Sequence, residues 1–439
     1  MQTQNTIPKH FPYIDTLFDY AEYLRNIDAN NGIGVCTDPN ITVAIIGTGA
    51  GGIITAHELL KSGVKNIHLY TPEDISYRPY GRCHSVPFKN QADPENPVIA
   101  ELGAMRFPIS SVGLFHYIHK YNISYIPDFP NPGQVKTLLR TNGKSYAWEA
   151  KQTPPDIFTK LDCGWKAFIH KGFTTNEGVH LTAPATLATL LKNQETEAVI
   201  PLWQQWIDTF ERVSFELALY MIFQKSDNPP GGENWDFQDI QLFGTLGVGS
   251  GGFNPIFRLG FTTQLHLFVN ELEVQQQFIP QGIQSVIDAI ACDVVGPYNM
   301  CVKDNIHQMA NYRLDTQVIR DANGNKKYRI HAGEHQLECD YVIFALPTWA
   351  LQLHHKQGLA KLKQQHLKPN VSIFQSDQLR AIAQQHLISS AKIFVQTDKK
   401  FWLNDEKCYQ NIQSDTIGRG FYCLDYNPQD PNEIGRAHV

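Results

Sequence analysis

The stretch ITVAIIGTGAGGIITAHELLKSG, Ile41–Gly63, decides the fold. Its first seven residues form an apolar, β-branched run, which is typical of a strand buried on both faces. From Ile53 the apolar residues recur at helical spacing, and the pattern ends at Gly63. A second strand-like run, KNIHLYT, follows over residues 65–71. The sequence therefore predicts a β-α-β unit.

Gly47, Gly49 and Gly52 form a G-x-G-x-x-G pattern between the predicted strand and helix. Backbone without side chains can approach phosphate oxygens closely, and the start of the helix adds a partial positive charge. The pattern in this context predicts a dinucleotide-binding turn. A second copy, GVGSGG at residues 247–252, precedes Pro255, which interrupts any helix there, so we expect a loop.

Two further positions extend the predicted dinucleotide site. An acidic residue at the end of the second strand normally contacts the ribose hydroxyls. Thr71 occupies that place here and Glu73 lies two residues on, so either could make the contact, and we favour Glu73. Arg82, in YGR, could return a positive charge to the pyrophosphate; a solvated surface arginine is the alternative.

The run IAELGAMRFP, residues 99–108, carries a single arginine among apolar and small residues. Burying a guanidinium alone is very costly, so Arg106 is expected to meet an anion. One candidate is a substrate carboxylate, which a guanidinium grips through two parallel hydrogen bonds. The other candidate is a structural pair with Glu101.

Together these motifs resemble the flavin amine-oxidase family, in its bacterial L-amino-acid oxidase and tryptophan 2-monooxygenase branch. The resemblance runs from Ile41 to Trp402 and is most specific at GAMRFP. The segments that carry it are VAIIGTGAGG, YGR, AELGAMRFP, GLFHYI, GSGGFNPIFRLGF, QQQFIPQGIQSVIDAI, DYVIFALP and SSAKIFVQTDKKFW.

The resemblance implies FAD as the cofactor and assigns roles to individual residues. Arg106 would bind the substrate carboxylate beside the flavin, and Lys392 would hold a water against the flavin N5. The implied flavin-binding residues are Gly47, Gly49, Gly52, Glu73, Arg82, Gly103, Ala104, Met105 and Arg106. The implied partners are a free L-amino acid and O2.

The implied reaction is FAD-dependent oxidation of an L-amino acid at its α-amine. A monooxygenase would give an amide, CO2 and water, and from tryptophan that amide is indole-3-acetamide. An oxidase would instead release a 2-oxo acid, ammonia and hydrogen peroxide. A third alternative is a truncated fragment that cannot retain FAD. Oxidation of plain amines is disfavoured, because it would leave Arg106 unmatched.

The expected fold is α/β, with a Rossmann-type FAD-binding domain built from separated segments and an inserted α+β substrate domain. A leader helix is expected near residues 13–25 and one long helix over Pro201–Phe223. The chain is expected to be truncated at its C-terminus. The expected units are a leader and linker (1–40), a first FAD-binding segment (41–110), a mainly helical substrate domain (111–270), a second FAD-binding segment with a β-ribbon (271–350), an incomplete return of the substrate domain (351–433) and a non-native tail (434–439).

Composition excludes several other classes of protein. A net charge of −6 provides no basic surface for nucleic acid. No signal peptide or uninterrupted apolar span of membrane length is visible, so we expect a cytoplasmic protein without a membrane partner. The eight cysteines form no C-x-x-C pair, which fits reduced thiols and no metal centre. A homo-oligomer stays open.

Overall fold

A computed structural model describes most of the chain. The described residues are 20–71, 76–88, 98–127, 129–246, 252, 254–308, 314–332, 335–353, 356, 373–385, 391–397, 399–425 and 435–438.

The predicted β-α-β unit is confirmed and lies at the centre of a parallel sheet. Its elements are β1 (Thr42–Ile46), α2 (Ala50–Lys61) and β2 (Asn66–Thr71). The sheet has the order β11-β2-β1-β15, where β11 is Ile306–Gln308 and β15 is Tyr341–Phe344. Because β15 pairs directly with β1, the chain returns to its first unit after a long insertion, as the sequence predicts.

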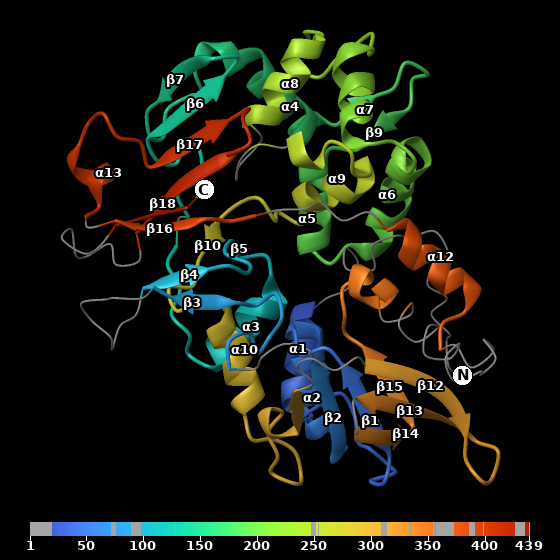
Figure 1. The fold of residues 1–439 in the computed structure, drawn as a ribbon. Coiled ribbons are helices and arrows are strands. Elements are labelled where there is room, and N and C mark those ends of the chain that lie inside the picture. Colours follow the sequence, from blue (N-terminus) through green and yellow to red (C-terminus); the bar gives the residue numbers. More distant parts are fainter. Residues whose placement is uncertain are drawn as a thin grey trace.

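The two faces of this sheet are covered differently. Helix α10 (Ile283–Cys292) packs with α2 on one face, around apolar residues such as Ile45 and Val286. The other face carries the antiparallel ribbon β12 (Leu314–Arg320), β13 (Lys326–Ala332) and β14 (His335–Cys339). Figure 1 shows the ribbon beside β1 and β15. This covering on both faces explains the continuous apolar character of β1.

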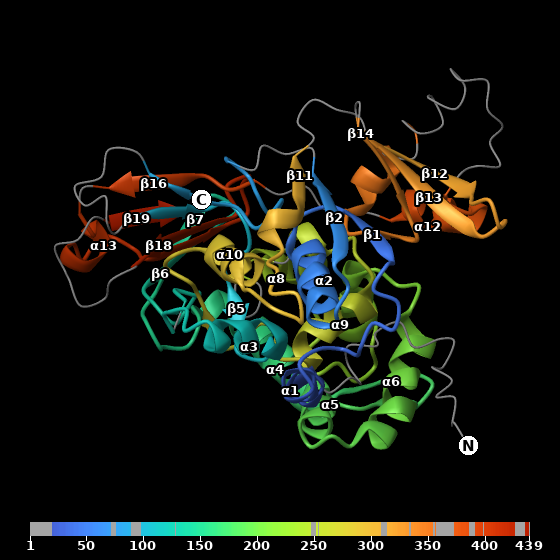
Figure 2. The same cartoon turned by 90° about the horizontal axis from the view of Figure 1, so that it is seen from below.

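A mixed sheet lies on the opposite side of the molecule from the ribbon in both views (Figures 1 and 2). Its hairpin of β6 (Thr137–Thr141) and β7 (Lys144–Trp148) turns through Asn142 and Gly143, which both have positive φ. The sheet has the order β16-β19-β18-β17-β6-β7, with β16 at Phe394–Thr397, β17 at Asn411–Ser414, β18 at Gly420–Leu424 and β19 at Gly435–His438.

Strand β19 falls within residues 434–439, which are expected to be a non-native tail. It pairs antiparallel with both β16 and β18. Ladder hydrogen bonds use backbone groups that every non-proline residue carries, so the composition of residues 434–439 does not preclude pairing. The proposed division of the chain into six units stays a prediction.

The inserted helical body surrounds an aromatic core that includes Trp203, Trp206 and Phe261. The long helix expected over Pro201–Phe223 is wrong, because the chain breaks after Phe210 and Ser214 caps a new helix by accepting a hydrogen bond from Leu217 N. The helices are α4 (Thr159–Lys171), α5 (Pro184–Lys192), α6 (Thr196–Phe210), α7 (Phe215–Leu219), the π-helix η3 (Tyr220–Gln224), α8 (Phe237–Leu246) and α9 (Phe261–Val269).

Shorter elements connect these bodies. The leader helix is α1 (Tyr20–Ala29), which packs on α3 (Val112–Lys120); residues 13–19 of the expected helix lie outside the described part. Of the second glycine-rich copy, residues 247–251 also lie outside it, and a 3-10 turn, η4 (Asn254–Ile256), follows instead of an α-helix. The others are β3 (Ser85–Pro87), β4 (Ile99–Glu101), β5 (Phe107–Pro108), η2 (Asp156–Phe158), β8 (Phe173–Thr174), β9 (His180–Leu181), β10 (Gln276–Gln277), η5 (Lys303–Asn305), α12 (Ser376–Gln384) and α13 (Phe401–Asn404).

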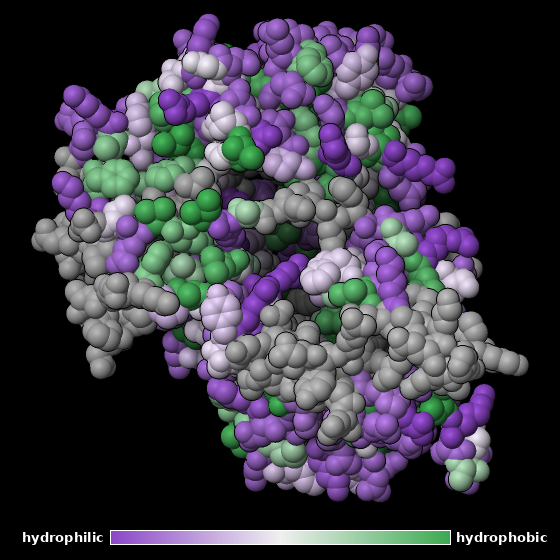
Figure 3. Space-filling model, viewed as in Figure 1, coloured by the Kyte–Doolittle hydropathy of each residue, from purple (hydrophilic) through white to green (hydrophobic). Residues whose placement is uncertain are grey.

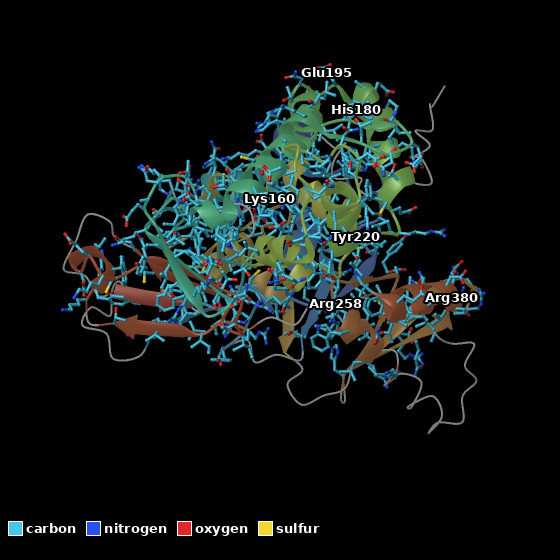
Figure 4. All side chains as sticks on the ribbon, turned by 90° about the horizontal axis from the view of Figure 1, so that it is seen from above. Lys160, His180, Glu195, Tyr220, Arg258 and Arg380 are labelled. Carbon is cyan, nitrogen blue, oxygen red and sulfur yellow. The ribbon has the colours of Figure 1, made fainter. Side chains whose placement is uncertain are left out.

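Lys160, Glu195 and Tyr220 mark the helical body in Figure 4, and Arg380 marks α12. Within the described residues, none of the helices has the length and apolar character needed to cross a membrane.

Candidate active site

In the first turn, packing requires a glycine at two of the three positions, whereas the third could hold a Cβ at ordinary contact distance. Gly47 has φ +111°, and a Cβ there would lie 2.6 Å from Ala345 O. A Cβ on Gly52 would lie 2.0 Å from Gly47 O, so the helix and the strand can meet only with a glycine at this position. At Gly49, by contrast, the nearest atom to a Cβ is Tyr80 O at 3.8 Å.

Gly49 is also the N-cap of α2 and offers no side-chain cap to the first turn of that helix. The N–H groups at a helix start need acceptors and favour an anion. A tight turn, a helix start without a side-chain cap and the absence of side chains at the glycines together fit the pyrophosphate of FAD. The residues that would hold it are Gly47, Gly49 and Gly52.

The YGR segment lies directly against this turn. Thr48 Oγ1 donates to Pro79 O at 2.7 Å, and a Cβ on Gly81 would lie 3.8 Å from Gly49 Cα. Arg82, the next residue, is exposed. The structure therefore brings the backbone of this segment against the glycine turn; the contact of Arg82 with the pyrophosphate stays a prediction.

The ribose contact stays a prediction. Thr71 is the buried last residue of β2, whereas Glu73 lies outside the described residues.

The GAM loop, residues 103–105, packs on the YGR segment, residues 80–82, and on the residues that follow it. Gly103 N donates to His84 O at 3.1 Å and to Glu101 Oε1 at 2.6 Å. A Cβ on Gly103 would lie 2.4 Å from Arg82 O, so only glycine allows this approach. Two segments that the resemblance places around one flavin are thus in direct backbone contact.

Glu101 anchors this junction. Its carboxylate accepts from Ser85 Oγ at 2.5 Å and from Ile283 N, the first residue of α10, at 2.9 Å, in addition to Gly103 N. Burial raises the pKa of Glu101 above its ordinary value, although these donors and the charge of Lys392 oppose that rise. The carboxylate thus joins the GAM loop to α10.

Lys392 reaches the same loop from the other end of the sequence. It lies just before β16, and its Nζ donates to Gly103 O and, at 3.3 Å, to Glu101 O. Burial lowers the pKa of Lys392, as does the nearby charge of Arg106, while Glu101 opposes that shift. Lys392 thus contacts the backbone of the loop that carries Arg106; its role toward a flavin-bound water stays a prediction.

Arg106 is half-buried in an aromatic slot. Its guanidinium carbon lies 5.6 Å from the centroid of the Phe129 ring and 5.7 Å from that of Tyr422. Both distances are within cation–π range. Met105, just before it, is buried in the same apolar cluster, whereas Ala104 is exposed. A guanidinium in such a slot is shielded from bulk water, which strengthens its attraction for an anion.

The space-filling view shows a recess near the middle of the molecule, beside β5 and β10 in the same orientation (Figures 1 and 3). Strand β5 begins directly after Arg106. A recess at the contact of two folding units is a common location for a small-molecule site.

Sequence reasoning missed Phe129 and Tyr422. Neither residue stands in a recognisable motif. Tyr422 lies on β18, and the centroid of its ring lies 5.4 Å from that of Phe129. Within the described residues no group of side chains could hold a metal ion. His116 Nε2 lies 3.2 Å from Asp28 Oδ2.

Comparisons with known proteins show what the whole chain is similar to. The pattern of the flavin containing amine oxidoreductase family matches residues 50–437. Tryptophan 2-monooxygenase of Pseudomonas savastanoi is 37% identical over 431 residues, covering 97% of this chain and 72% of that protein. The enzyme of the same name from Agrobacterium tumefaciens (strain Ach5) is 35% identical over 97% of this chain, which spans about half (53%) of that protein.

Solved structures support the fold. Cyclohexylamine oxidase from Brevibacterium oxydans matches 91% of this chain and 75% of its own, with a TM-score of 0.54 and 13% identity. A redesigned putrescine oxidase matches with a TM-score of 0.53 and 13% identity, over 91% of this chain and 74% of its own. The predicted α/β fold is thereby confirmed.

Proposed function

The chain belongs to the flavin-containing amine oxidoreductase family, and from that premise we propose that it oxidises a free L-amino acid at the α-amine with FAD as cofactor. The observation that carries the substrate class is Arg106, half-buried between Phe129 and Tyr422 and adjacent to the GAM loop. A planar guanidinium binds a carboxylate through two charge-assisted hydrogen bonds, which fix its orientation as well as its position.

Each residue then has a physical task. Arg106 binds the substrate carboxylate and thereby aligns Cα, which is where a positioned reactant gains most in rate. FAD held at the glycine turn would supply the redox chemistry for oxidation at Cα. Gly103 keeps the backbone close to Arg82, and Lys392 holds the Gly103 carbonyl oxygen. The exposed Arg82 and the uncapped start of α2 would neutralise the pyrophosphate.

The outcome that we propose is that of a tryptophan 2-monooxygenase, with indole-3-acetamide, CO2 and water as products from L-tryptophan and O2. The named relatives that align over 97% of the chain support it. An L-amino-acid oxidase, which releases a 2-oxo acid, ammonia and hydrogen peroxide, is the alternative that shares the same carboxylate site.

One experiment separates these outcomes. The purified protein is loaded with FAD, its visible spectrum is recorded, and it is incubated with L-tryptophan in air. Indole-3-acetamide without stoichiometric peroxide supports the monooxygenase, whereas peroxide with indole-3-pyruvate supports the oxidase. A protein that acts on tryptamine as well as on L-tryptophan contradicts the role of Arg106.

We keep the cytoplasm as the proposed location, because all eight cysteines are free thiols. We propose no nucleic-acid or membrane partner, and a homo-oligomer stays open.

A further inference from the structure

Two buried amide side chains lie behind the aromatic slot. Gln413, on β17, is 1% exposed, and its Nε2 donates to Asn411 Oδ1 at 2.7 Å and to Tyr422 OH at 3.3 Å. Asn411 is fully buried, and its Nδ2 donates to Pro130 O at 2.7 Å. Pro130 directly follows Phe129. The pair of amides therefore connects both aromatic residues that flank Arg106.

Strand pairing does not account for these amides. The backbone of β17 pairs with β6 on one side and β18 on the other, and that pairing needs no particular side chain. A buried amide costs free energy unless its hydrogen bonds are made, so an apolar residue would be the simpler choice at either position. What Asn411 and Gln413 add is a fixed position for Tyr422 OH and for the backbone next to Phe129.

The position of the two rings matters for Arg106. Cation–π attraction depends on the distance from the cation to the ring face, and a two-point grip on a carboxylate depends on the plane of the guanidinium. If the rings shifted, the guanidinium could rotate. It would keep its charge, but its plane would no longer be aligned with the substrate carboxylate.

We propose that Gln413, acting with Asn411, is a positioning residue for the carboxylate-binding arginine. It holds Tyr422 and the Phe129 segment as two walls that set the plane of the Arg106 guanidinium, and it touches neither substrate nor flavin. This inference rests on the proposed function, because it assumes that Arg106 binds the carboxylate.

The test compares Gln413→Leu with a matched control. Gln410 precedes β17 and donates its amide to Cys423 O at 3.3 Å, next to Tyr422 in sequence but not to its hydroxyl. Gln410→Leu therefore removes a similar hydrogen bond from the same strand pair without releasing the Tyr422 ring. Both variants are prepared with FAD bound, and their folding is checked by circular dichroism.

The main readout is equilibrium binding, measured by calorimetry with two ligands that share an indole ring. Indole-3-acetate carries the carboxylate and indole-3-acetamide does not. We expect Gln413→Leu to weaken the binding of indole-3-acetate about 10-fold, with little change in the binding of indole-3-acetamide. Gln410→Leu should leave the ratio of the two dissociation constants as in wild type. For L-tryptophan, Gln413→Leu should raise KM more than it lowers kcat.

Tyr422→Phe supplies a second variant should Gln413→Leu not fold. It keeps the ring and removes the hydroxyl that Gln413 contacts, so it should weaken indole-3-acetate selectively, by about 3-fold. In the double variant the two effects should not add, because both remove the same contact.

The outcomes are distinguishable. A wild-type preference for indole-3-acetate that is unchanged in both Gln413→Leu and Tyr422→Phe overturns the positioning role alone. Equal weakening of both ligands in Gln413→Leu also overturns it, since that indicates a merely structural effect. Wild-type protein without any preference for the carboxylate ligand overturns the proposed function of Arg106 and this inference with it.

Discussion

The Lys392 ammonium donates to the carbonyl oxygen of Gly103, a residue 289 positions earlier in the chain. This contact brings the segment before β16 onto the GAM loop, and it places two cations, Lys392 and Arg106, close enough for the arginine to lower the pKa of the lysine. A site with two neighbouring positive charges is well suited to hold a carboxylate.

Lys392 should make the free energy of unfolding depend on pH in the alkaline range. Burial lowers its folded-state pKa below the ordinary value of 10.5. The unfolded chain therefore binds more protons than the folded one between the two pKa values, and stability should rise with pH through that window. In Lys392→Met this rise should be absent. Urea unfolding from pH 7 to pH 10.5 measures it, and parallel curves for the two proteins would contradict it.

Arg106→Ala should lower kcat/KM far more for a substrate that carries a carboxylate than for one that lacks it. Loss of a two-point, charge-assisted contact is expected to cost about 3 kcal/mol of transition-state binding, or ~100-fold in kcat/KM. The loss should be found for L-tryptophan and should be small for tryptophan amide, which lacks the anionic group. Steady-state oxygen consumption with both compounds measures it. An equal loss of kcat/KM for the two substrates would contradict the role of Arg106 in binding the carboxylate.

Substitutions in the glycine turn should separate a loss of fold stability from a loss of bound flavin. Gly52→Ala places a Cβ 2.0 Å from Gly47 O and should destabilise the fold by about 3 kcal/mol. At Gly49 the backbone is extended and a Cβ would lie at ordinary contact distance, 3.8 Å from Tyr80 O, so Gly49→Leu should fold but exclude the flavin. Thermal unfolding and bound flavin absorbance together separate the two effects.

Gly51 offers the matched control for this series. Nothing lies within 4 Å of a Cβ there, so Gly51→Ala should keep the flavin and gain about 0.5–1 kcal/mol of helix stability. A Gly49→Leu protein that retains FAD at the wild-type ratio would refute the assignment of the turn.

The parts of the fold that could be predicted from sequence are those encoded locally. The β-α-β unit follows from apolar periodicity and glycine spacing within a short stretch, and the hairpin at Asn142-Gly143 follows from its turn residues. The break before α7 was missed because apolar residues continue across it. The capping side chain of Ser214 was the available signal, and periodicity outweighed it.

The aromatic slot could not be predicted for a different reason. Phe129 and Tyr422 come together through the pairing of β17 with β6 and β18, and no local pattern specifies which distant strands will pair. Arg106 could be recognised alone, because a charge in an apolar run is anomalous wherever it stands. Its neighbours are ordinary aromatic residues, which most chains use in their cores.

A group of histidines against the parallel sheet should make the fold sensitive to acid. His68 Nδ1 lies 3.0 Å from His307 Nε2, and the rings stack with Tyr70 and His335 beside them. Burial and the neighbouring imidazoles lower the pKa of His68 and His307. Because the unfolded chain then binds more protons, stability should fall as pH drops below about 6.5 toward the lowered values. Urea unfolding between pH 8 and pH 5 should show that the free energy of unfolding depends less on pH in His307→Phe than in wild type.

Exposed His180, labelled in Figure 4, provides the control. His180→Phe should keep the pH dependence of wild type. The same flattening in His180→Phe would contradict the assignment of the effect to the stacked histidines.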